Sequence, residues 1–173
     1  MIEAANIILS LLAVFGQILI LFIFISLLFG KNAKPLAFLG KNAILLAFLV
    51  AAGATLGSLF YSEIAGFEPC KLCWFQRIFL FPQVIVLGLA LLGKATDVKN
   101  IAIALSALGA AFAVYHNLLL AGFVSGGWCS TAAVSCAQNF VFAFGYITIP
   151  VMSLTAFLLI IALMATSPQS TRP

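Results

Sequence analysis

Charged side chains are scarce in this sequence. Only 7% of the 173 residues are Asp, Glu, Lys or Arg, whereas charged residues make up about a quarter of an ordinary soluble domain. Hydrophobic residues account for 65% of the chain. This composition excludes a soluble globular domain and indicates a membrane protein, in which nearly all of the length is needed for spans of about 20 residues each.

The sequence also lacks a basic cluster suited to nucleic acid. The net charge is +4, but six of the eight basic residues lie in two short linkers and the C-terminal tail. Lys and Arg accumulate in the cytoplasmic loops of membrane proteins, so this placement is expected of topology signals. We therefore expect no nucleic-acid partner and assign these six residues to the cytoplasmic side: Lys31, Lys34, Lys41, Lys94, Lys99 and Arg172.

The N-terminal apolar run lacks the basic start of a cleavable signal peptide. It extends from Ala4 to Phe29, follows Glu3, and is longer than the apolar stretch of about 7 to 15 residues that a signal peptide has. We interpret it as a retained membrane helix. Four further spans are predicted, at Ala43–Tyr61, Cys73–Leu92, Ile101–Phe123 and Ile147–Thr166.

These five spans give an all-α membrane protein, with a four-helix bundle at 43–166 and one extra helix before it. The N-terminal unit is 1–42, and a short cytoplasmic tail follows at 167–173. With the six basic residues inside, the N-terminus and the two loops near the cysteines are outside and the C-terminus is cytoplasmic.

Two connecting segments carry more specific expectations. Pro35 and Gly40 should interrupt any helix in the linker 30–42. The uncharged aromatic segment 137–146 is expected to lie in the membrane interface as a short helix.

Small residues predict close helix packing. Gly53 and Gly57 have the Gly-x-x-x-Gly spacing that lets membrane helices approach closely, and we expect this contact within the chain rather than between copies. The fourth span is rich in Ala and Gly and should pack tightly on a neighbour.

The four cysteines form two pairs, Cys70/Cys73 and Cys129/Cys136, both at the predicted outer face. Spacing alone leaves metal binding, structural bridges and redox chemistry open. Outside the cytoplasm thiols are driven to disulfides. Bridges that close such short loops remove little chain entropy, so they suit thiol–disulfide exchange better than stapling.

The start of the third span should favour a reactive thiolate. Pro69 disfavours helix in the residue before it, so the helix is expected to begin near Cys70. Cys73 then lies in the first turn, close to the positive end of the helix dipole.

Arg77 lies one turn after Cys73 on the same helix face. An arginine at this depth is costly unless it reaches the interface or has a partner, such as Glu63, Glu68 or a lipid phosphate. The functional alternative is a hydrogen-bond donor to a carbonyl compound dissolved in the membrane.

The segment from Pro69 to Arg77 reads Pro-Cys-x-x-Cys-aromatic-aromatic-Gln-Arg. With the second cysteine pair and the segment Gly145–Leu154, it resembles the DsbB/BdbC family of disulfide bond formation proteins, over Ala43 to Met164. The resemblance implies a thiol:quinone oxidoreductase of the bacterial inner membrane. Such a protein passes electrons from a thioredoxin-like, DsbA-like oxidase to ubiquinone or menaquinone. The family resemblance does not explain the role of the helix at Ala4–Phe29.

The resemblance also assigns roles to the cysteines. Cys129 would form the mixed disulfide with the partner, and Cys136 would exchange with Cys70. Cys73 would face the quinone and react with it as a thiolate.

Two further residues are implied at the quinone. Arg77 would bind a quinone oxygen. His116, in a Tyr115-His116 pair similar to one in the Gram-positive-type branch, would approach the quinone or relay a proton; a hydrogen bond to a backbone carbonyl is the alternative.

Three other classes of protein compete with this interpretation. A structural or sensory zinc protein would use all four cysteines as ligands, but zinc gives Arg77 no role. A quinone reductase similar to vitamin K epoxide reductase has its Cys-x-x-Cys after the loop pair, whereas here it comes first. A non-enzymatic membrane subunit leaves the paired spacing and the arginine unexplained. The redox interpretation assigns no metal to the cysteines.

Overall fold

The computed structural model describes residues 2–29, 34–94, 97–124, 129, 135–137 and 140–167. Helices account for most of these residues. In chain order the elements are α1 (Ile2–Phe29), α2 (Lys34–Lys41), α3 (Ala43–Leu59), the π-helical turn η1 (Phe60–Ile64), α4 (Lys71–Leu91), α5 (Val98–Leu120) and α6 (Ile149–Thr166).

Within the described residues, five helices are long and apolar enough to cross a membrane: α1, α3 continued by η1, α4, α5 and α6. All five coincide with predicted spans to within a few residues, which is the usual uncertainty of helix ends. The predicted fold class is therefore confirmed, and the chain is a multi-pass membrane protein.

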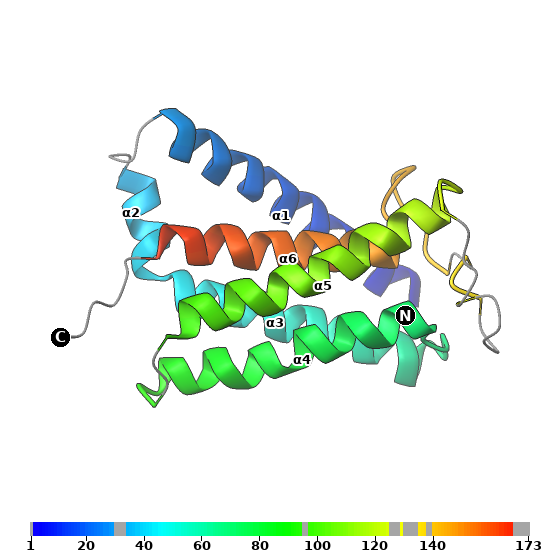
Figure 1. Ribbon diagram of the computed structural model, residues 1–173. Helices are drawn as coiled ribbons and strands as arrows, with labels where there is room; N and C mark the ends of the chain where they lie inside the picture. The colour runs from blue at the N-terminus through cyan, green and yellow to red at the C-terminus, as the bar shows by residue number, and fades with distance from the viewer. Residues whose placement is uncertain are drawn as a thin grey trace.

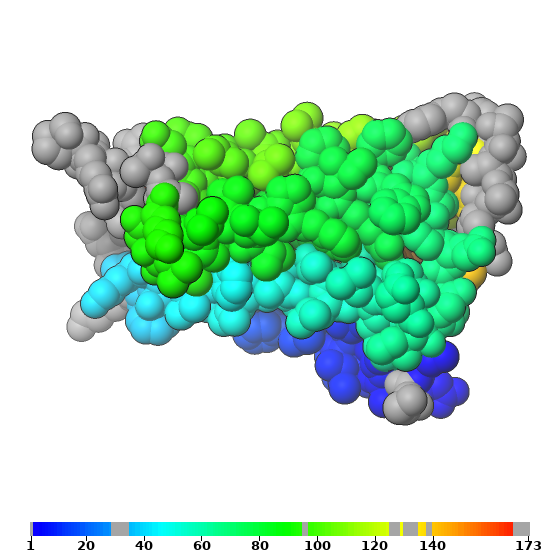
Figure 2. All heavy atoms as spheres, turned by 90° about the horizontal axis from the view of Figure 1, so that it is seen from below, coloured from blue at the N-terminus to red at the C-terminus, as the bar shows by residue number. Residues whose placement is uncertain are grey.

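Helices α3 to α6 form a closed bundle of four. Helix α4 packs between α3 and α5, and α6 packs against α3 and α5 on the other side. Figure 1 shows the four helices lying lengthwise beside one another, and in Figure 2 α3 and α4 together cover one face of the bundle. Helix α1 lies outside this bundle along α6.

The two ends of the bundle differ in chemistry. One end, called here the cysteine end, carries Cys70 and Cys73 at the start of α4, His116 near the end of α5, and Cys129 and Cys136 beyond it. The opposite end is where α2 ends, where α4 passes into α5, and where α6 ends. Lys41, Lys94 and Lys99 belong to this second end, whereas Lys71 begins α4 at the cysteine end.

Small residues let α5 approach α6. Gly109 packs directly on the Phe157 ring of α6, and a Cβ added at Gly109 would overlap that ring. Phe157 has no exposed surface. The expected tight packing of the fourth span is thus confirmed.

Only one glycine of the Gly53/Gly57 pair lies at a close helix contact. A Cβ at Gly57 would stand 3.2 Å from the Leu9 side chain of α1, so this glycine lets α1 approach α3. A Cβ at Gly53 would meet nothing within 4 Å. The predicted close contact within the chain is therefore present at Gly57 alone.

Polar side chains also join α4 to α5 in the bundle interior. Ser106 donates a hydrogen bond of 3.0 Å to the Gln83 side-chain oxygen, and the Gln83 amide nitrogen donates to the Phe79 carbonyl at 2.9 Å. Both Gln83 and Ser106 are fully buried. Because every polar group in lipid needs a partner, this pair fixes the contact between the two helices.

Two expectations about connecting segments are wrong. Residues 34–41 form helix α2 although they contain Pro35 and Gly40. Pro35 is in the first turn, where its missing N–H has no helical partner to lose, and Gly40 is in the last turn, where a helix interruption costs little.

The expected interfacial helix at 137–146 is absent from the described part of that segment. Ala143 and Ile147 pair through two backbone hydrogen bonds of 2.9 and 2.8 Å, forming an isolated β-bridge. Phe144 and Gly145 between them have positive φ angles of 53° and 82°. Two successive left-handed residues reverse the chain and are incompatible with a helix. Residues 138–139 lie outside the described part.

The Gly109 contact gives a test of the packing. Gly109→Ala should destabilise the bundle by about 1–3 kcal/mol, because the added methyl group overlaps the fully buried Phe157 ring. Gly53→Ala is the matched control, since its Cβ enters open space and alanine is the better helix former. Thermal unfolding of both variants in the same detergent measures the difference. Equal melting temperatures would contradict the packing described.

Candidate functional site at the cysteine end

The Cys70/Cys73 pair is built by the start of α4. Cys70 is the N-cap, with extended backbone angles, and its carbonyl accepts the first helical hydrogen bond from Trp74 at 3.1 Å. Cys73 is the third residue of the helix, as the sequence predicts. The two thiols are free and their sulfur atoms are 3.3 Å apart.

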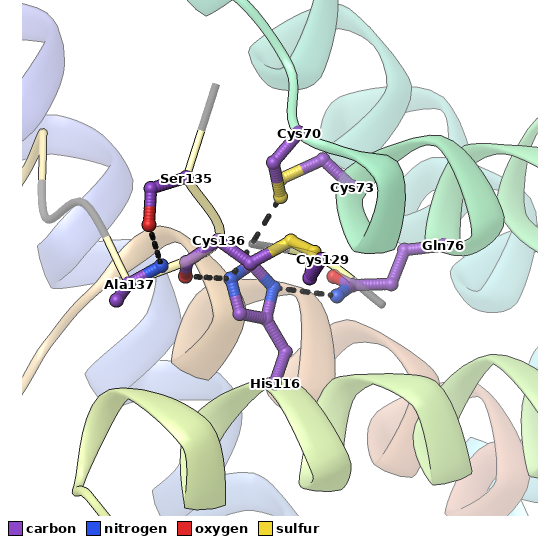
Figure 3. The surroundings of a disulfide bond; sticks show 8 residues. All are labelled: Cys70, Cys73, Gln76, His116, Cys129, Ser135, Cys136 and Ala137. Atoms are coloured by element: carbon purple, nitrogen blue, oxygen red, sulfur yellow. Dashed lines mark hydrogen bonds between the residues drawn. A yellow bond between two sulfur atoms is a disulfide. The ribbon is translucent and has the colours of Figure 1, made fainter. Parts of the chain in front are cut away.

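Cys129 and Cys136 form a disulfide, with their Cα atoms 5.9 Å apart. Both are almost completely buried, at 1% and 2% exposure, which the sequence does not indicate. They share one buried cluster with Cys70, Leu72 and Leu119. The structure therefore brings the disulfide and the Cys-x-x-Cys thiols together at one end of the bundle (Figure 3).

His116 contacts both cysteine pairs. Its Nε2 atom lies 3.0 Å from the Cys136 carbonyl oxygen and 3.9 Å from the Cys70 sulfur, while Nδ1 lies 3.2 Å from the Gln76 amide nitrogen. Figure 3 shows the ring between these three groups. With Gln76 donating to Nδ1, the ring proton is on Nε2, which donates to the Cys136 carbonyl; this tautomer follows from the hydrogen-bond network.

These contacts favour the thiolate of Cys70. The hydrogen bond from the Cys73 thiol lowers the pKa of Cys70 most, and the hydrogen bond from His116 lowers it further, against the opposing effect of burial. A thiolate with a lowered pKa is a better leaving group in thiol–disulfide exchange.

A small cavity adjoins the thiols. Its volume is about 30 Å³, and its lining includes Cys70, Cys73, His116, Ser135 and Phe140. This is room for about two water molecules. A quinone ring is much larger and does not fit this cavity as it stands.

A stack of three aromatic rings ends at the cavity. The Phe67 ring stacks on Tyr61 of η1 at 5.8 Å and on Phe140 at 4.8 Å between centroids. Phe140 in turn lines the cavity. The stack connects the end of the second membrane span to the segment that follows Cys136.

Arg77 lies on α4 as predicted, but its partner is not one of those expected. Its Nε and one Nη donate to the side-chain and backbone oxygens of Ser58 on α3, at 2.9 and 2.8 Å. The guanidinium also lies 5.4 Å from the centre of the Trp74 ring. Within the described residues Arg77 bonds to Ser58 instead of pairing with Glu63 or Glu68.

Sequence reasoning missed two contributors to the site. Gln76 is inside the recognised motif, and its polar amide in a membrane helix was a usable signal. Ser58 carried no such signal, because serine is common in membrane helices and bonds readily to its own backbone.

The four-cysteine zinc alternative does not fit this arrangement. Cys129 and Cys136 are bonded to each other, so their sulfurs are not available as thiolate ligands. The described residues instead bring one imidazole to the remaining cysteine pair.

Comparison with known proteins decides the family. The profile described as "Disulfide bond formation protein DsbB" matches residues 40–167. The chain belongs to this family. It is therefore a thiol-oxidising oxidoreductase, and the resemblance seen in the sequence is confirmed.

Individual relatives agree with this assignment. A "Probable disulfide formation protein" of Deinococcus radiodurans is 43% identical over 129 residues, covering 69% of this chain and 84% of that protein. "Disulfide bond formation protein C" of Bacillus subtilis is 41% identical over 129 residues, covering 72% and 93%. A "Probable disulfide formation protein" of Metapseudomonas resinovorans is 37% identical over 134 residues, covering 76% and 93%. The comparison with solved structures gives no significant match.

The hydrogen bond from Cys73 to Cys70 gives a pH prediction. The background for this test is a protein with Cys129 and Cys136 replaced by alanine. In this background Cys73→Ser leaves Cys70 as the only thiol and keeps a hydroxyl donor beside it. Cys73→Ala also leaves Cys70 as the only thiol but removes the donor. Losing a hydrogen bond to the thiolate raises the thiol pKa. The rate of Cys70 alkylation should therefore rise with pH at a midpoint about one pH unit higher in the alanine variant.

The measurement is the alkylation rate over a pH series with a small maleimide. The two variants share the same background, so they differ only in the donor at position 73. Coincident pH profiles would show that Cys73 does not stabilise the Cys70 thiolate.

Proposed function

We propose that this protein reoxidises a thioredoxin-like thiol oxidase outside the bacterial inner membrane and passes the electron pair to a membrane quinone. The relay would run from the Cys129/Cys136 pair to the Cys70/Cys73 pair. The observation that supports it best is the meeting of both pairs at His116, 3.0 Å from the Cys136 carbonyl and 3.9 Å from the Cys70 sulfur.

The first exchange takes the electrons from the partner. A partner thiolate attacks the Cys129 sulfur, releases Cys136 as a thiolate and forms a mixed disulfide. The second partner thiol resolves it, so the partner leaves oxidised and Cys129 and Cys136 are both reduced. Because Cys129 is almost fully buried, this step requires the partner to open the cysteine end.

The second exchange moves the electrons inward. The Cys136 thiolate attacks Cys70 of an oxidised Cys70–Cys73 pair and releases Cys73. Cys129 then attacks Cys136, which restores the outer disulfide and releases Cys70. The result, an outer disulfide with free thiols at Cys70 and Cys73, is the combination present in the structure.

His116 and the thiol of Cys73 favour the direction of this exchange. The Cys73 thiol donates to the Cys70 sulfur, and the His116 ring faces that sulfur at 3.9 Å. Both lower the pKa of Cys70, which makes it the better leaving group when Cys129 attacks. Gln76 acts through His116, because its amide holds the ring nitrogen Nδ1 and keeps the proton on Nε2.

The residues near Cys73 suit a quinone. Cys73 is more exposed than Cys70, and two exposed apolar side chains, Trp74 and Ile78, follow it on α4. Arg77 uses two of its five N–H donors on Ser58. We assign quinone binding to Cys73, Arg77 and His116, and this binding requires the small cavity beside Cys73 and His116 to widen. When bound, the quinone supplies an acceptor for two electrons and two protons.

The positions of the basic residues support an orientation in the membrane. Lys41, Lys94 and Lys99 are at the end opposite the cysteines, whereas Lys71 and Arg77 lie at or near the cysteine end. Loops rich in basic residues remain in the cytoplasm. The cysteine end would then face the oxidising side, where a disulfide relay can operate.

Turnover with a reduced thioredoxin-like oxidase and a soluble quinone tests the relay. Each of the variants Cys70→Ser and Cys73→Ser should lose quinone-dependent oxidation of the partner, because either change removes one sulfur of the inner pair. Lys94→Ala, at the opposite end, is the control and should turn over normally. Full turnover by either serine variant would rule out the proposed route.

Arg77 tests the quinone end separately. Arg77→Ala should raise the KM for quinone by roughly tenfold or more, the effect of losing one charge-assisted hydrogen bond. The KM for the reduced partner should not change, since Arg77 lies away from the outer pair. Arg77→Lys keeps the positive charge but loses the planar guanidinium group. Its KM for quinone should therefore lie between those of the parent and of Arg77→Ala. An unaltered KM for quinone in Arg77→Ala would remove this residue from the site.

A further inference from the structure

Three potential metal ligands meet at the cysteine end. The Cys70 and Cys73 sulfurs and a ring nitrogen of His116 all lie within 4.8 Å of one another. The two sulfurs are 3.3 Å apart, and the Cys70 sulfur is 3.9 Å from His116 Nε2. This group differs from a four-cysteine site, because it combines one cysteine pair with an imidazole.

The two separations that involve the Cys70 sulfur are close to those of a tetrahedral zinc site. With Zn–S bonds of about 2.3 Å and Zn–N bonds of about 2.0–2.1 Å, tetrahedral ligands stand about 3.8 Å apart for two sulfurs and about 3.6 Å apart for sulfur and nitrogen. The observed 3.3 and 3.9 Å differ from these values by half an ångström or less. The third pair, the Cys73 sulfur and the His116 ring nitrogen, lies within 4.8 Å, so rotation of the Cys73 and His116 side chains would complete the site.

The surroundings provide room for an ion and a fourth ligand. The cavity of about 30 Å³ is lined by all three of these residues and by Ser135. A water molecule can occupy the fourth position there, as in zinc sites with three protein ligands. Two thiolates and a neutral imidazole also balance the charge of Zn²⁺, which suits a mostly buried site.

Gln76 is placed to support the metal-bound ring. Its side-chain amide lies 3.2 Å from His116 Nδ1. If Nε2 binds a metal, the ring proton moves to Nδ1, and the Gln76 amide can turn to accept it through its oxygen. A hydrogen bond of this kind to the second ring nitrogen is the usual support for a histidine ligand.

We propose that Cys70, Cys73 and His116 form a redox-gated binding site for Zn²⁺ or a similar thiophilic cation, open only when the Cys70/Cys73 pair is reduced. Binding replaces the thiol protons by the metal and transfers no electrons. Formation of the Cys70–Cys73 disulfide removes both sulfur ligands and closes the site. Metal at this place would hold the inner pair reduced and block its reoxidation.

The proposal does not depend on the proposed electron route, because binding is measured without partner or quinone. The full-length protein in detergent is reduced, freed of reductant and metal, incubated with Zn²⁺, and passed through a gel-filtration column. Zinc retained per chain is then determined. We expect one zinc in the reduced protein and none after the thiols are oxidised.

Variants assign the ligands. The double variant Cys129→Ala/Cys136→Ala should still retain one zinc per chain. This result would distinguish the proposed site from a site with four cysteine ligands. Cys70→Ser and Cys73→Ser should each lose it. Their elution volume and helical circular dichroism show whether they remain folded.

Gln76 gives a readout that a purely structural role would not produce. Gln76→Leu should weaken zinc binding by about 10- to 100-fold. Gln76→Glu, which can still accept from Nδ1, should bind at least as tightly as the parent. In the parent, bound zinc should also protect Cys70 and Cys73 from alkylation.

Three results would each overturn the proposal: no zinc retained by the reduced protein, equal retention by the reduced and oxidised forms, or unchanged affinity in Cys70→Ser. Loss of zinc in the Cys129/Cys136 double variant would instead indicate a four-cysteine site. Failure of zinc binding leaves the turnover experiments with the partner and quinone unaffected, so the two proposals are tested separately.

Discussion

The cysteine end depends on one imidazole with two nitrogens. His116 Nδ1 is held by Gln76 of α4, and Nε2 is held by the Cys136 carbonyl while facing the Cys70 sulfur. The ring stands on α5, so three separate parts of the chain meet through it. At 3% exposure His116 has almost no contact with water. A buried ring of this kind needs partners for both nitrogens, and the partners present are the groups that position the sulfurs.

The two thiols of the Cys-x-x-Cys differ because the helix begins between them. Cys70 is the N-cap and lies in the buried cluster with the outer disulfide, whereas Cys73 is inside the first turn and less buried. Pro69 disfavours an earlier helix start. The pair therefore connects two environments: one sulfur contacts the protein interior, and the other is near exposed apolar side chains of α4. The same asymmetry serves electron transfer and metal binding in the two proposals.

The membrane spans and the start of α4 were predictable because each depends on residues that are close together in the sequence. Span positions follow from apolar length, and the start of α4 follows from Pro69 and the cysteine spacing. The turn at 143–147 was not predictable from its aromatic composition, since the left-handed angle of Phe144 is uncommon for that residue. The Arg77–Ser58 bond and the burial of Cys129 depend on how distant segments pack. No pattern in the neighbouring sequence indicates either feature.

The extra helix α1 also contributes to the site, although the family profile begins only at residue 40. The Gln17 side chain accepts a hydrogen bond from the Tyr146 hydroxyl at 2.7 Å and donates one to the Thr155 hydroxyl at 3.2 Å. An amide in a membrane helix is costly without partners, so these two bonds favour one register of α1 against α6. Tyr146 belongs to the turn that follows Phe140, which lines the cavity beside the thiols. Through Gln17, a helix outside the four-helix bundle thus holds the turn next to Phe140, at the edge of the cavity beside the thiols.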